Sequence, residues 1–189
     1  MSASMSPHLS SEAVAVAAER RWSFLVLGII ALLIAVMIVT GLHWASMPPS
    51  RVETVDVKSL HVKGEFVESN LGTVLEPDGK VTVRLVAQQY SFEPQCIVVP
   101  VDMPVTFRGT ASDAIHGFVV GKTNANTMLV PGFVSTFTMT FHQAGEQLMP
   151  CHEYCGTGHE AMWAHVRIVP GKEFLAMARN GERMDCVPR

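Results

Sequence analysis

The chain has 189 residues, of which 48% are hydrophobic and only 16% are charged, and its formal net charge at pH 7 is -3. Soluble domains carry about 25% charged residues, so this composition argues against a wholly soluble chain and leaves room for one domain plus a further segment. No basic run or aromatic-studded basic patch occurs, which excludes nucleic acid from the expected partners.

The first expected element is a transmembrane helix over residues 23–42. The run SFLVLGIIALLIAVMIVTGL contains no charge and no proline, and about 20 apolar residues are needed to cross a bilayer as a helix. Trp22 and Trp44 bracket the run, as aromatic residues do at membrane surfaces. A cleaved secretory signal is the alternative, but its apolar core spans about 7–15 residues and a small-residue cleavage site follows it. Because the run is longer and lacks such a site, we predict a retained membrane anchor.

The charges that flank this run predict its orientation. Arg20 and Arg21 precede it directly, whereas Glu53 and Asp56 are among the first charges after it. By the positive-inside rule, residues 1–22 stay in the cytoplasm and everything after the helix is exported. The sequence SSEAVAVAAERRW, with a serine ahead of an acidic first turn, is expected to extend the helix on the cytoplasmic side.

The exported part is expected to be a linker followed by one β domain. Residues 43–80, with prolines near the membrane and sparse apolar residues, are interpreted as a linker or stalk. Over residues 81–170, short β-rich runs alternate with turn residues, which is typical of a Greek-key β-sandwich or barrel. The predicted strands are VTVRLVAQQY, CIVV, PVTFRG, IHGFVVG, VSTFTMTF and MWAHVRIV. Residues 171–189 are predicted to form a tail and a short amphipathic helix, with Phe174, Leu175 and Ala178 as its apolar residues and Gly181 at its end.

Two histidine-bearing segments are expected to meet at one rim of this domain. His116 begins a middle strand, and the run CHEYCGTGHEAM lies between the last two strands. This run places Cys151, Cys155 and His159 at intervals of four residues, with Met162 three residues later. Thiolate, imidazole and thioether are soft-to-borderline ligands that suit copper, with zinc possible.

Three chemistries compete for this run. A disulfide between Cys151 and Cys155 would close a cramped ring and leave the methionine and the histidine unexplained. Zinc could use both cysteines with His159 and His116, but structural zinc has no use for a thioether. A mononuclear blue-copper site needs a single cysteine, whereas a second bridging thiolate lets two copper ions share both sulfurs and accounts for every donor.

At these residues the chain resembles a known family. HGF preceded by SD, then VPG, then CHEYCGTGHEAM, is similar to the copper A domain of subunit II of haem-copper cytochrome c oxidases. The stretches SDAIHGFVV, TNANTMLVPG and EYCGTGH resemble the single-helix, B-type form, and the resemblance implies a cupredoxin-like fold from the membrane helix to about Val169. The ligands that it implies are the bridging thiolates Cys151 and Cys155, His116 and Met162 on one copper, and His159 with the backbone carbonyl of Glu153 on the other.

The chain departs from the family in one stretch. Where the family has a tryptophan-rich Q-W-Y-W-S-Y-E, which helps to accept electrons, this chain has AQQYSFE, with Gln88 at the place of the first tryptophan. Tyr90 and Phe92 remain aromatic, and we interpret both as strand core. The resemblance therefore does not predict which surface of this chain meets the protein that donates electrons.

Three residues near the ligands have expected supporting roles. At Glu153 the chain has the same glutamate as the family, in which its side chain helps to bind magnesium at the interface with subunit I. Asp113 lies three residues before His116 and is expected to orient that imidazole or its loop. His152 is expected to be exposed to solvent or to an interface, with tuning of the metal site as the alternative.

The resemblance implies the electron-entry subunit of an oxidase. It takes electrons from cytochrome c or a blue-copper protein and passes them to a haem in membrane subunit I, where oxygen is reduced. A copper A subunit of a nitric oxide reductase and a membrane-tethered cupredoxin carrier without an oxidase stay open as alternatives. The expected location is the plasma membrane of a bacterium or archaeon, with the copper domain on the periplasmic or outer face.

Two cysteines are left over from the motif. Cys96 lies in EPQCIVVP and Cys186 lies three residues from the end of the chain. An exported domain sits where disulfides persist, so an even pair can form a bridge. The alternative is a small buried residue at Cys96 and a free thiol at Cys186, and the sequence leaves both open.

Overall fold

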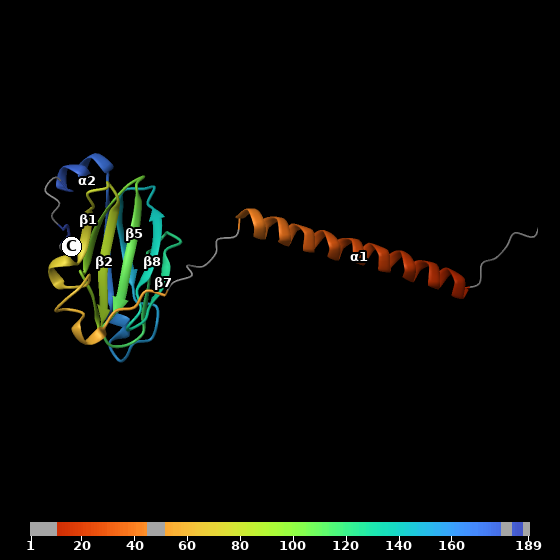
Figure 1. Ribbon diagram of the computed structural model, residues 1–189, viewed down its shortest axis with the longest axis horizontal. Helices are drawn as coiled ribbons and strands as arrows, with labels where there is room; N and C mark the ends of the chain where they lie inside the picture. Colours follow the sequence, from red (N-terminus) through yellow and green to blue (C-terminus); the bar gives the residue numbers. More distant parts are fainter. Residues whose placement is uncertain (1–10, 45–51, 179–182, 187–189) are drawn as a thin grey trace, which may run out of the picture. The chain divides into compact units, whose positions relative to one another are not determined.

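The chain divides into two compact units, Met1–Ser50 and Arg51–Arg189. A computed structural model describes residues 11–44, 52–178 and 183–186, and Figure 1 shows one long helix in the first unit and the strands in the second. Gly181, the predicted end of the C-terminal helix, lies outside the described residues.

The described residues of the first unit form one long helix, α1 (Ser11–Trp44). Among the residues that the structure describes, it is the one helix long and apolar enough to cross a membrane, with a mean hydropathy of 3.0 over its most apolar part. Its 34 residues span about 51 Å at about 1.5 Å each, which exceeds the ~30 Å hydrocarbon layer. Most of the surplus lies before Ser23, where the sequence predicts an extension of the helix. The hydroxyl of Thr40 donates to the Val36 carbonyl (2.8 Å), so this polar group is satisfied inside the helix.

The second unit is a sandwich of two β-sheets, as predicted. In one sheet, β1 (Gly72–Leu75), β2 (Val81–Gln88), β5 (Pro104–Ala111) and β8 (Ser135–Thr140) lie in that order, and β3 (Ser91–Glu93) also pairs with β2. The other sheet has the order β4 (Cys96–Pro100), β10 (Trp163–Val169) and β9 (Gly145–Pro150), while β6 (His116–Val119) and β7 (Asn126–Leu129) form a separate ribbon. Strands β2 and β5 run parallel and side by side, so both end at the same edge of the sheet (Figure 1).

The core lies between the sheets, because alternate residues of the strands face inward. In β2, the fully buried residues of the main core include Val81, Val83 and Leu85. Phe107 of β5 stacks on Phe137 of β8, with ring centroids 5.1 Å apart and planes within 4° of each other. Successive side chains of a strand point to opposite faces of its sheet, so every second residue of these strands points into the core.

The β domain begins earlier than residue 81, which corrects the predicted linker over residues 43–80. The structure places β1 in the sheet, and Thr54 pairs with Phe133. Between them, Leu60 and Phe66 are buried against Val86 on the outer face of β2. Residues 52–71 therefore form a strap over that face, held by sparse apolar contacts that the sequence pattern did not reveal.

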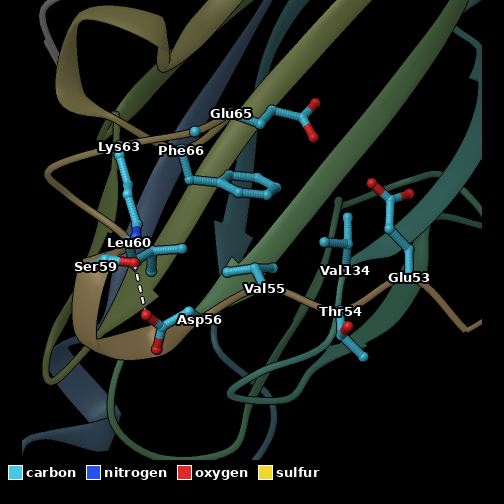
Figure 2. Close-up of a pocket in the computed structure, with 11 residues that line it drawn as sticks. Glu53, Thr54, Val55, Asp56, Ser59, Leu60, Lys63, Glu65, Phe66 and Val134 are labelled. Atoms are coloured by element: carbon cyan, nitrogen blue, oxygen red, sulfur yellow. Dashed lines mark hydrogen bonds between the residues drawn. The ribbon is translucent and has the colours of Figure 1, made fainter.

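The strap is also tied to the sheet by charge. The Glu65 carboxylate accepts hydrogen bonds from Arg84 (3.0 Å) of β2 and from Arg108 (2.5 Å) of β5. Beside these contacts the strap lines a pocket of about 390 Å³, and Figure 2 shows its Leu60 and Phe66 side chains together with the Ser59–Asp56 hydrogen bond. None of the predicted metal ligands lines this pocket.

The C-terminal segment closes one edge of the sandwich. Helix α2 (Gly171–Met177) buries Phe174, in agreement with its predicted amphipathic character. Beyond it, Met184 pairs with Thr73 of β1, and Cys186 forms a disulfide with Cys96 of β4. The tail thus joins the edge strands of the two sheets, and the bridge between the two spare cysteines is confirmed.

Candidate metal centre

The two ligand-bearing segments meet at one end of the sandwich, as predicted. His116 is the first residue of β6, and the ligand loop (Cys151–Met162) connects β9 to β10. The backbone N–H of Cys151 donates to the Met162 carbonyl (3.0 Å), which closes the ligand loop at its base. Cys151 also forms a β-bridge with Phe118 of β6. These backbone pairings hold His116 beside the loop.

The structure brings all six predicted donors together around two sulfur atoms. The thiols of Cys151 and Cys155 lie 4.0 Å apart, and both are free, so a Cys151–Cys155 disulfide is not formed. The other donors lie beside one thiol each: His116 Nδ1 (3.9 Å) and the Glu153 carbonyl (3.3 Å) at Cys151 Sγ, and His159 Nδ1 (3.6 Å) and Met162 Sδ (3.7 Å) at Cys155 Sγ.

The donor set fits a pair of soft metal ions better than a single zinc. A structural zinc takes four donors, whereas this site offers two thiols, two imidazoles, a thioether and a carbonyl. The Met162 side chain is 1% exposed and lies against Cys155, so its sulfur belongs to the site. Thioether beside thiolate and imidazole is the combination that proteins use for copper.

The Cys155 thiol is costly to ionise. Burial first, and then the neighbouring Cys151, raise its pKa to about 11. A metal binds the thiolate form, so metal binding displaces protons at neutral pH. Two anionic sulfurs 4.0 Å apart in a desolvated site need a cation between them, which is the electrostatic reason for placing metal here.

Asp113 makes the contact with His116 that the sequence predicted. Its Oδ1 accepts from His116 Nε2 at 2.9 Å. The carboxylate also accepts from the backbone N–H groups of Gln89 (2.7 Å) and Ala114 (2.6 Å). Partial burial by itself would raise the pKa of Asp113, but these hydrogen bonds outweigh it and lower the pKa below its ordinary value. The carboxylate is therefore ionised at neutral pH and fixes the ring by its far nitrogen.

His152 is less exposed than expected. Its side chain is 25% exposed, and its Nε2 atom is buried without a hydrogen-bond partner among the described residues. The ring packs on Gly117, where an added Cβ would lie 2.5 Å from His152 Cε1. Gly117, directly after the predicted ligand His116, was a signal for this close approach that the sequence interpretation did not use.

The prediction that Tyr90 and Phe92 are both strand core is confirmed for Phe92 and is wrong for Tyr90. Phe92 is fully buried, whereas Tyr90 is 38% exposed. Tyr90 lies against the ligand loop, with its hydroxyl 3.3 Å from the Thr157 hydroxyl. The neighbouring Gln89 side chain donates to the Cys155 carbonyl. Sequence reasoning assigned neither residue to the site.

Fold and site together define a class of protein. The chain carries a long apolar helix and a β-sandwich domain, and one end of that domain gathers two buried thiols, a buried thioether, a buried imidazole and a partly exposed one. This combination is typical of membrane-anchored electron-transfer domains.

Comparison with known proteins narrows the class to one family. Residues 88–169 match the family described as "Cytochrome C oxidase subunit II, periplasmic domain". A curated cytochrome c oxidase subunit 2 from Thermus thermophilus is 32% identical over 161 residues, which cover 84% of this chain and 95% of that protein. A second one from Thermus thermophilus is 33% identical over 120 residues, which cover 64% of this chain and 89% of that protein.

A solved structure supports the fold. A chain of a heme-copper terminal oxidase dimer is similar with a TM-score of 0.54 and 24% identity, over 79% of this chain and 99% of that chain. The chain belongs to the cytochrome c oxidase subunit II family. The cupredoxin-like fold is confirmed, and the family role is that of the copper A, electron-entry subunit of an oxidoreductase complex, with a membrane anchor and a periplasmic domain.

Proposed function

We propose that the chain holds a binuclear copper A centre in which Cys151 and Cys155 bridge the two ions. His116 and Met162 complete the ligands of one ion, and His159 with the Glu153 carbonyl completes those of the other. The pair of free, buried thiols 4.0 Å apart, each beside one imidazole, carries the bridging role of the two cysteines. The division of the other donors between the two ions follows the family resemblance.

The residues of this site suit electron transfer and no bond chemistry. When bound, a copper pair that shares both thiolates supplies reversible one-electron transfer. Every donor comes from this chain, which leaves no open ligand position for a substrate. Four of the donor residues are buried from water: His116, Cys151, Cys155 and Met162. His116 begins β6, and Cys151 and Met162 directly adjoin β9 and β10, so the strands hold these three donors in place when the charge of the site changes.

Electrons arrive from a cytochrome c, or from a blue-copper protein, and pass to the haem of subunit I, where oxygen is reduced. Tyr154 lies within the ligand loop and is 77% exposed, which supports a surface beside the site that the electron-donating protein can reach. The relatives named cytochrome c oxidase subunit 2 favour oxygen over nitric oxide as the final acceptor. They also favour an oxidase partner over an independent carrier.

The N-terminus lies in the cytoplasm and the copper domain on the periplasmic or outer face of the plasma membrane. Arg20 and Arg21 before the apolar run support this orientation through the positive-inside rule. Protease added to intact spheroplasts should remove the domain beyond Leu42 and spare residues 1–22. Loss of the N-terminal segment with survival of the domain would reverse the orientation.

The Glu153 side chain is a candidate ligand for magnesium at the interface with subunit I. Its carboxylate is 45% exposed, and among the described residues its ion pair is a long 3.8 Å contact with His152. A half-exposed carboxylate oxygen is a ligand that Mg²⁺ prefers. Glu153→Gln in the assembled oxidase should lower its bound magnesium without lowering its copper content.

Purification of the chain from its native membrane tests the proposed function. A haem-bearing membrane subunit should copurify, and the complex should consume oxygen when supplied with reduced cytochrome c. Reduction of nitric oxide without oxygen uptake would favour the reductase, and copper without any haem partner would favour a tethered carrier.

A further inference from the structure

A two-residue turn contacts both ligand-bearing segments of the metal centre. Gln89 and Tyr90 connect β2 to β3 at the end of the larger sheet. The loop with Asp113 and His116 lies on one side of this turn, and the ligand loop lies on the other. Neither residue is among the six donors.

Gln89 joins the two segments through two separate groups. Its backbone N–H donates to Asp113 Oδ2 (2.7 Å), and the other oxygen of that carboxylate holds His116 Nε2 (2.9 Å). Its side-chain amide donates to the carbonyl of Cys155. One residue thus fixes the carboxylate that orients one imidazole and the backbone that carries one thiol.

Tyr90 covers the same part of the ligand loop. Added Cβ atoms would lie 2.5 Å from the Tyr90 hydroxyl at Gly156 and 2.7 Å from its Cδ2 at Gly158. The ring therefore occupies the space that side chains at these positions would fill. Its hydroxyl lies 3.3 Å from that of Thr157, between the two glycines. The packing of Tyr90 thus requires glycine at both positions.

We infer that Gln89 and Tyr90 are positioning residues that hold Cys155 in register with His116. The inference rests on the proposed copper site. A glycine-containing loop can adopt many backbone conformations. The Gln89 amide on its carbonyl and the Tyr90 ring against its glycines restrict the loop to few of them. Groups that orient metal ligands typically change metal affinity by about 10–100-fold when removed. The turn lies in the stretch where this chain departs from the tryptophan-rich sequence of its family.

Gln89→Met in the full chain, purified in detergent and loaded with copper, tests the inference. Methionine keeps the length of the side chain and removes the donor to Cys155. Copper affinity, measured by competition with a chelator, should fall about tenfold. The copper electron paramagnetic resonance spectrum and the reduction potential should both change, because the position of one bridging sulfur is no longer fixed.

Gln88→Met is the matched control. Gln88 is the preceding residue but lines a separate pocket with His61, Glu68 and Asp185. The same chemical change at this position should leave copper affinity, spectrum and potential as in the unmodified chain. Equal behaviour of the Gln88 and Gln89 variants, with copper bound normally in the unmodified chain, would overturn the inference and leave the copper site intact as a proposal.

A milder pair of variants guards against a folding effect. Tyr90→Phe and Thr157→Val each remove one partner of a single hydroxyl contact. Each should increase the rate of copper loss to a chelator by about two- to tenfold, and the double variant should equal either single one. Additive effects would show that the contact is not made. If the unmodified chain binds no pair of copper ions when copper is added to its metal-free form, the proposed function itself is wrong.

Discussion

The Nε2 atom of His116 donates to Asp113 at 2.9 Å, and this contact leaves Nδ1 of the same ring facing the Cys151 thiol at 3.9 Å. A histidine ligand has two nitrogens, and the hydrogen bond on one decides which nitrogen is offered to a metal. The carboxylate therefore selects the tautomer of the only proposed ligand that lies outside the ligand loop.

Replacement of Asp113 by asparagine should lower the copper affinity of the site and change its reduction potential. The amide keeps the shape but carries no charge, so it stabilises the ring less as electron density moves to the metal. We expect copper affinity to fall about 10-fold and the reduction potential to rise. Asp102→Asn is a matched control, because Asp102 also contacts a histidine, His142, at 2.9 Å on the exposed surface. Equal potentials in the two variants would contradict a role for Asp113.

The two sulfur ligands of different type should respond differently to substitution. Cys155→Ser removes a bridging donor from both ions, so the chain should retain at most one copper. Met162→Leu removes a weak thioether donor from one ion, so the pair should persist with a shifted potential. Copper analysis and voltammetry of the two variants distinguish these outcomes. Identical spectra and potentials in both would show that the ligand assignment is wrong.

The strap should make the stability of the domain depend on pH through Glu65. Partial burial raises the pKa of Glu65, but hydrogen bonds and charge from Arg108 and Arg84 lower it more, so the net pKa lies below its ordinary value of 4.5. A carboxylate with a depressed pKa stabilises the fold fully above that ordinary value. The stabilisation is then lost as the pH falls through the lower, folded-state pKa.

Glu65→Gln should therefore cost about 1–3 kcal/mol of unfolding free energy at pH 7, and the difference should vanish in acid. Denaturant unfolding of both chains at a series of pH values measures it. Asp78→Asn removes the exposed ion pair with Lys80 and should leave stability unchanged. A Glu65→Gln deficit that persisted in acid would mean that packing, and not charge, holds the strap.

The disulfide should stabilise the tail and the domain together. The Cys96–Cys186 bridge spans a sequence separation of 90 residues and joins the edges of the two sheets. Cys186→Ser should lower stability by about 2–5 kcal/mol, with the copper spectrum unchanged. Mass spectrometry after alkylation without reduction should find both cysteines unmodified. Alkylation of both before reduction would show that the bridge is absent.

Local spacing in the sequence singled out the candidate donors Cys151, Cys155, His159 and Met162, which lie within twelve residues, whereas the Glu153 carbonyl came from the family resemblance. Short β-rich runs between turn residues predicted β2, β5 and β8, whose inward faces are strongly apolar.

The strap was missed because its contacts are few and distant in sequence, such as Phe66 on Val86. Strand β1 was missed although it forms a local hairpin with β2, in which Leu75 pairs with Val81. The roles of Gln89 and Tyr90 were missed for the same reason as the strap, since Cys155 and Thr157 lie 66 and 67 residues away.

Electron paramagnetic resonance of the copper-loaded full chain, together with copper analysis, tests the central claim most directly. The account predicts two copper ions per chain and one unpaired electron shared equally by two copper nuclei, because Cys151 and Cys155 bridge them. A single copper per chain, or an unpaired electron confined to one nucleus, would contradict it.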